Sequence, residues 1–221
     1  MHSPSTRTTG EAVDAMRSPL PTESAPADAA AWRPLGVLPD GTPITARPLR
    51  PDDHCWWAEW GAGLSPRSVY RRFLSGYSLP PVRLLDRLLD AVDGQRHVAV
   101  VAAAPAAVSP APAPPSWPDR TTVPVAITRF VRADDDPTTA HVACTVIDAW
   151  HGRGVGTLLI KELISWALAL GVTTFTATVD AENRASLQVL KKAGRIDRWE
   201  RAGGVVEVSI ALGRAGRDDQ G

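Results

Sequence analysis

Hydrophobic positions along this chain follow two different periods. Between Val155 and Leu170 they return every three or four residues, as on the apolar face of a helix, and Gly171 directly after them is a typical helix end. Between Thr173 and Val179 apolar residues instead alternate with threonines, which is typical of a half-buried strand. The chain therefore combines helices and strands.

The same periods, followed along the whole chain, give an ordered succession of elements. The predicted strands are 43–48, 97–103, 123–131, 141–147, 173–179, 196–201 and 205–212. The predicted helices are 51–61, 65–74, 80–91, 155–170 and 183–193. A hairpin around Ala202–Gly204 joins the last two strands. This order predicts an α+β fold, with a mixed central β-sheet of about seven strands flanked by helices.

Three segments show no sustained period. Residues 1–34 and 213–221 are poor in large apolar side chains, and we expect them to be disordered tails outside the fold. Residues 104–120 contain closely spaced prolines, which remove backbone donors, so we expect a flexible, dispensable Pro/Ala-rich insertion between two strands. The predicted domain is thus one unit spanning residues 35–212.

Composition argues against several classes of function. The 221 residues include 24 Lys or Arg and 24 Asp or Glu, and this zero net charge argues against a nucleic-acid partner. No apolar run approaches the roughly 20 residues that cross a bilayer, and no secretory signal is visible, so we expect a cytoplasmic protein without a membrane partner. The histidines, Cys55 and Cys144 lack metal-ligand spacing, so we expect reduced thiols and no metal.

A glycine-rich segment, Gly152–Thr157, lies between a predicted strand and the long predicted helix. Glycines let the backbone approach a ligand closely, and the helix N-terminus adds free N–H groups, so this segment can bind an anion without a lysine. The spacing G-x-G-x-G differs from the dinucleotide fingerprint G-x-G-x-x-G, and Gly156 is followed by Thr157 without the lysine of a P-loop. A loop whose glycines only serve a tight turn remains an alternative.

The loop resembles the pyrophosphate motif of the GNAT acetyltransferase superfamily, Q/R-x-x-G-x-G/A, with a departure at the first position, which is His151. A later segment, Asn183 followed by a helix that stops at Gly194, resembles the family's second motif. The sequence LRPDD followed by LSPRSVYRRFL is similar to the N-terminal signature of the bacterial Pat-type protein-lysine acetyltransferase subgroup. The resemblance covers residues 42–212, apart from the insertion.

This resemblance implies a cofactor site in a splayed sheet. Acetyl-CoA would bind as co-substrate, with Asn183 facing coenzyme A. A β-bulge near Val146 would free a backbone N–H for the thioester carbonyl. The sheet would open between its fourth and fifth strands, here 141–147 and 173–179. The residues implied to hold the pyrophosphate, chiefly through backbone N–H groups, are Gly152, Arg153, Gly154, Val155, Gly156 and Thr157.

The resemblance also locates the catalytic groups. His141 stands where the Pat-type subgroup carries a glutamate, and an imidazole with a pKa near 6.5 can accept a proton at neutral pH. A strand-edge histidine without a chemical role is the alternative. Leu190 stands where many members carry a tyrosine acid, so the thiolate of coenzyme A would leave without a donor there.

The function implied is N-acetyl transfer from acetyl-CoA to an amine acceptor, either a small molecule or a protein lysine. The departures at His141 and Leu190 support an alternative, a non-catalytic acyl-CoA-binding regulatory domain. Trp57 and Trp60 share one face of the first predicted helix, where core packing is favoured over the lining of an acceptor groove. The sequence leaves the oligomeric state open.

Overall fold

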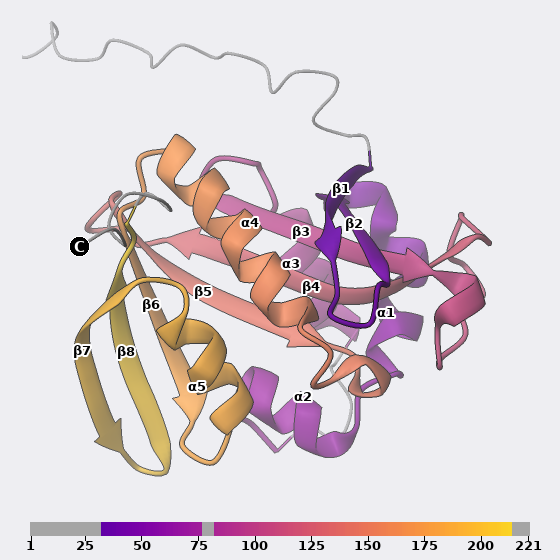
Figure 1. The fold of residues 1–221 in the computed structure, drawn as a ribbon. Coiled ribbons are helices and arrows are strands. Elements are labelled where there is room, and N and C mark those ends of the chain that lie inside the picture. Colours follow the sequence, from indigo (N-terminus) through magenta and orange to yellow (C-terminus); the bar gives the residue numbers. More distant parts are fainter. Residues whose placement is uncertain (1–31, 77–81, 214–221) are drawn as a thin grey trace, which may run out of the picture.

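A computed structural model describes residues 32–76 and 82–213. Its centre is a mixed eight-stranded sheet with the order β1-β2-β3-β4-β5-β6-β8-β7 (Figure 1). The strands are β1 (Arg33–Val37), β2 (Pro43–Pro48), β3 (His97–Pro105), β4 (Thr122–Arg132), β5 (Thr139–Val146), β6 (Thr174–Asp180), β7 (Arg195–Ala202) and β8 (Val205–Ala211). Neighbouring strands pair antiparallel except β5 and β6, which are parallel.

Five α-helices accompany the sheet in the described residues. They are α1 (His54–Gly61), α2 (Pro66–Phe73), α3 (Val82–Asp90), α4 (Val155–Ala169) and α5 (Arg184–Lys191). The predicted start of the third helix at Pro80 lies outside the described residues, as does nearly all of both predicted tails. The α+β class and the mixed sheet flanked by helices are confirmed.

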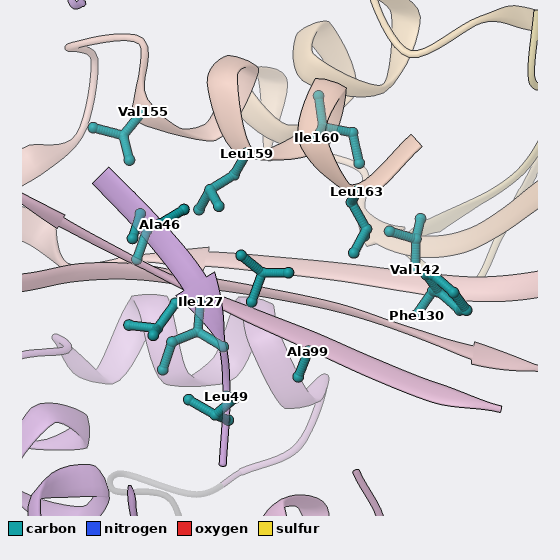
Figure 2. Close-up of a cluster of buried hydrophobic side chains, with 14 of the residues drawn as sticks. Ala46, Leu49, Ala99, Ile127, Phe130, Val142, Val155, Leu159, Ile160 and Leu163 are labelled. Atoms are coloured by element: carbon teal, nitrogen blue, oxygen red, sulfur yellow. The ribbon is translucent and has the colours of Figure 1, made fainter. Parts of the chain in front are cut away.

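The helices cover both faces of the sheet. The apolar face of α4 packs on one side, where Leu159 and Leu163 lie against the sheet with Phe130 and Val142 (Figure 2). On the other side, Ile127 faces the space under α1 and α3. Each central strand is therefore buried on both faces, which explains the nearly continuous apolar run of β3.

Strand β1 is absent from the prediction, so the sheet has eight strands rather than about seven. Its sequence RPLGV contains a proline and a glycine, and a register shift between Pro34 and Gly36 interrupts its pairing with β2. A short edge strand with one neighbour does not need a continuous alternation of side chains. The strand begins at Arg33, two residues before the predicted domain limit.

The sheet splays between β5 and β6, as predicted. The two strands pair only from Thr139–His141 to Thr174–Thr176, although β5 continues to Val146 and β6 to Asp180. Beyond His141 the strands separate, and backbone groups that would otherwise pair face a gap in the sheet.

The expectation of a flexible insertion at residues 104–120 is wrong. Trp117 is only 1% exposed, and its ring packs edge-on against that of Trp56 with 4.7 Å between the centroids. Its indole N–H donates to Thr122 Oγ1, and Ser116 donates to Glu59 on α1. Beyond the end of β3 at Pro105 and a 3₁₀ turn at Ala106–Val108, the segment has no regular structure, but one large aromatic side chain anchors it to the core.

Candidate active site

A cleft of about 740 Å³ opens where β5 and β6 separate. Its walls come from the end of α2, the separating parts of β5 and β6, the glycine loop with the first turns of α4, and α5. The splay creates this space, because the backbones of β5 and β6 form no hydrogen-bonded pairs there and lie apart. A volume of this size is in the usual range for a small-molecule or cofactor site.

The glycine loop forms one end of the cleft. After β5, a short 3₁₀ turn leads to Gly152 and Gly154, whose φ angles of 74° and 98° lie in the left-handed region that favours glycine. Helix α4 then begins at Val155, so its free N–H groups and positive dipole end lie beside the loop. A backbone arranged in this way can bind an anion.

Five of the six predicted loop residues line the cleft, and Arg153 does not. Its guanidinium pairs with Asp40 at 2.6 Å and lies 3.9 Å from the centroid of the Trp150 ring. Hydrogen bonds from Arg153 and Thr42 lower the pKa of Asp40 to about 2. The Arg153 side chain thus fastens the loop to the β1–β2 turn, away from the cleft.

His151, the departure from the family pattern, has a local structural role. Its Nε2–H donates to the carbonyl oxygen of Val146 at 2.8 Å, and its side chain lines the cleft. This bond joins the end of β5 to the start of the glycine loop. The bond uses no backbone N–H group of the loop. The N–H of Thr157 donates to the carbonyl oxygen of Gly154 at 3.0 Å, and the substitution is compatible with an anion site on the other N–H groups.

The predicted β-bulge near Val146 is absent, because the β4–β5 register is continuous from Val146 to Ala140. The splay itself frees the backbone donors. Since the N–H of Ile147 donates to Val125 on β4 at 3.0 Å, the alternation of a strand turns the N–H of Val146 to the other side, towards the cleft.

His141 is the last residue of β5 that pairs with β6, and its side chain borders the cleft. Its Nδ1 lies 3.4 Å from the Thr176 hydroxyl. Partial desolvation, with a smaller contribution from the charge of Arg72, lowers the pKa of His141 below its usual 6.5. The ring is therefore neutral at pH 7 and can accept a proton.

Helix α5 forms the opposite wall. Asn183 caps it, with its side-chain oxygen accepting from the N–H of Ser186 at 3.3 Å, and it also lines the cleft. Leu190 also lines the cleft. The nearby thiol of Cys144 is a poor nucleophile, because burial raises its pKa to about 11.

Sequence reasoning missed the contribution of α2. Ser68, Arg71 and Arg72 line the cleft, and Arg71 pairs with Asp180 at the end of β6 at 3.1 Å. The signal in the sequence was the pair of arginines in SVYRRF.

Asp148, in the 3₁₀ turn before the glycine loop, also escaped notice. Its carboxylate accepts from the backbone N–H and hydroxyl of Ser65 and from the hydroxyl of Ser68. These bonds fix the N-terminus of α2 beside the turn that leads into the loop.

A splayed α+β sheet with a backbone anion site at a helix N-terminus defines a class of cofactor-binding folds, and comparison with known proteins identifies the family. The model described as "Acetyltransferase (GNAT) domain" matches residues 44–195. The chain belongs to the GNAT acetyltransferase family.

No helix among those described combines the length and the apolar character needed to cross a bilayer.

Particular relatives are bacterial acetyltransferases. The chain is 32% identical over 155 residues to "Acetyltransferase Pat" of Mycolicibacterium smegmatis, covering 70% of this chain but only 41% of that protein. The solved GNAT domain of S. lividans PAT is 25% identical, with a TM-score of 0.67 over 85% of this chain and 99% of that one. A putative Salmonella typhimurium acetyltransferase, solved with its cofactor acetyl-CoA, shares the fold at 15% identity and a TM-score of 0.57, covering 79% of this chain and 98% of that one.

Proposed function

We propose that this protein transfers an acetyl group from acetyl-CoA to an amine acceptor. The observation that carries the proposal is one cleft that combines the left-handed glycines at the start of α4 with the N–H of Val146 at the splay. The loop offers donors for the pyrophosphate, and the strand offers a donor for the thioester carbonyl.

The cofactor would extend between these two sites, with its pyrophosphate on the backbone from Gly152 to Thr157. Asn183 stands on the opposite wall, beside the path of coenzyme A. No lysine or metal is needed, since backbone N–H groups and the helix dipole together favour a negative ligand.

The acceptor nitrogen loses two protons overall, the second of them to solvent as the amide forms. The acceptor ammonium loses the first proton and then attacks the thioester carbonyl carbon as a neutral amine. His141 is the proposed base, taking that proton on its neutral ring directly or through a water. The negative charge that develops on the carbonyl oxygen is stabilised by the N–H of Val146. The C–S bond then breaks, and the thiolate takes its proton from solvent, because Leu190 cannot donate one.

Substitution of Gly156 tests the cofactor site. A Cβ there would lie 3.7 Å from Val189 and 3.8 Å from Val146, at ordinary contact distance, so Gly156→Ala should fold and still bind. Gly156→Trp would fill the space between α5 and β5, and we expect acetyl-CoA affinity to fall by at least about 100-fold in calorimetry. Affinity unchanged by the tryptophan would place the cofactor elsewhere.

Turnover distinguishes the enzyme from the regulatory domain. Release of free thiol from acetyl-CoA, followed with a set of amines that includes free amino acids and a lysine peptide, should rise with acceptor concentration. Binding of acetyl-CoA without thiol release for any acceptor would favour a regulatory acyl-CoA-binding domain. This second function is supported by Leu190, which lines the cleft at the position where many family members carry a proton-donating tyrosine.

A further inference from the structure

A second, smaller cavity adjoins the cleft beside β5. It has a volume of about 20 Å³ and lies between the sheet and helices α1, α2 and α3. It shares Arg72, Phe73, Ala143 and Thr145 with the lining of the cleft, so a ligand in the cleft can place one end in it. Most of its remaining wall is apolar and includes the buried side chains of Trp57 and Trp60.

Arg129 points into this cavity from β4 and is only 4% exposed. Its Nη1 donates to the carbonyl oxygen of Leu88 and to His97 Nε2, both at 3.2 Å. Burial and the charge of Arg129 lower the pKa of His97 to about 4, so that ring is neutral. Arg129 has no carboxylate partner within residues 32–76 and 82–213, and its charge is uncompensated there.

Two more hydrogen-bond donors line the same cavity. The partly buried guanidinium of Arg72 lies 5.0 Å from the centroid of the Phe73 ring and makes no hydrogen bond or ion pair with any described residue. The indole N–H of Trp57 is buried and lacks a partner in the described parts of the chain. In the sequence, residues 77–81, YSLPP, include no acidic residue.

Two guanidinium groups around one cavity, neither of them paired with an acidic side chain in the described part of the chain, are costly because buried charges are stable only when paired. A bound anion would supply the missing charge and the missing acceptors. Since about 10–15 Å³ of such volume holds one water, 20 Å³ suits the oxygens of a carboxylate and is too small for a phosphate.

We infer that this cavity receives the carboxylate of the acceptor, so that the acceptor is a small amine carrying a carboxylate, of amino-acid type. The inference rests on the proposed function. Ala143 and His141 lie on the same face of β5, two residues and roughly 7 Å apart along the strand. A molecule with an amine a few bonds from its carboxylate therefore spans the distance between the cavity and His141.

The test compares acceptors that differ only in the anion. Thiol release from acetyl-CoA is measured with each free amino acid and with its primary amide, which keeps the amine and removes the charge. We expect kcat/KM to be about 10- to 100-fold higher for the preferred free acid than for its amide. Arg129→Gln and Arg72→Gln should reduce this preference, whereas Arg195→Gln, on an exposed arginine of β7, should leave it unchanged. Equal rates for acid and amide, or a peptide lysine preferred to every free amino acid, would overturn the inference while leaving acetyl transfer intact.

A binding measurement keeps the cavity testable without turnover. The melting temperature of the wild type should be higher in sodium acetate than in a mixture of acetamide and sodium chloride at the same ionic strength. The effect should disappear in Arg129→Gln and persist in Arg195→Gln. Absence of the acetate effect in the wild type, or its persistence in Arg129→Gln, would show that the cavity does not bind a carboxylate. Absence of thiol release from every acceptor would instead count against the proposed function.

Discussion

At the scale of single residues, His141 is the side chain on which the proposed chemistry depends. Replacing it with alanine should lower kcat by roughly 10²–10⁴-fold, because the acceptor loses its positioned base. Affinity for acetyl-CoA should change little, since the proposed cofactor contacts are backbone groups on the glycine loop. His141→Glu should retain activity, because a carboxylate at the same place can also accept a proton.

The pH profile separates a base from a merely structural side chain. Only neutral imidazole accepts a proton, so the wild-type rate divided by the His141→Ala rate should rise with pH and then level off. Because desolvation lowers the pKa of His141, the midpoint of this rise should lie below pH 6.5. The ratio cancels the ionisation of the acceptor amine. A ratio near one at every pH would assign the proton to another group or to water.

At the scale of elements, Asp148 couples α2 to the turn before the glycine loop. Burial opposes the ionisation of Asp148, but hydrogen bonds from Ser65 and Ser68 outweigh it and lower the pKa. Asp148→Asn should therefore cost about 1–3 kcal/mol of the free energy of unfolding at pH 7, measured by urea denaturation. Asp135→Asn, in an exposed turn, is the matched control.

The sign of the pH effect follows from the direction of the shift. A carboxyl whose pKa is lowered on folding stabilises the protein above its unfolded pKa, near 3.9, and this contribution fades as pH falls through the folded value. The difference between wild type and Asp148→Asn should accordingly be full at pH 7 and shrink in acid. A difference that stays constant down to pH 3 would contradict the role of the charge.

At the scale of the whole molecule, the proline-rich segment is part of the core. Truncation of Trp117, which is 1% exposed and packs on Trp56, should cost about 3–5 kcal/mol. For a domain of this size, that corresponds to a fall of about 6–20 °C in melting temperature. Deletion of residues 108–118 should lower it at least as much, whereas Val108→Ala, which is 51% exposed in the same segment, should have little effect. A deletion variant that melts with the wild type would show that the segment is dispensable.

Local sequence patterns predicted most elements because each is governed by its own residues. The apolar face of α4 predicted a helix within one residue of its observed end, and the alternation after Thr173 predicted β6. Gly152 and Gly154 were predicted to form an anion-binding turn, and both adopt the left-handed backbone that glycine favours. The splay followed only from the resemblance, since pairing between strands leaves no mark within either strand.

Tertiary structure alone decided where side chains with several possible partners point. Arg153 turns to Asp40 in a hairpin more than 100 residues earlier, and Trp117 reaches α1 from a segment without regular structure. In the sequence, Arg129 is one charged residue in an apolar strand. In the fold, the packing of α1 and α3 buries it with no acidic partner among residues 32–76 and 82–213. The sequence by itself determined most of the elements and the glycine turn, because these depend on neighbours along the chain. The cleft, its adjoining cavity and the groups that face them depend on contacts between distant segments, and only the folded chain brings those together.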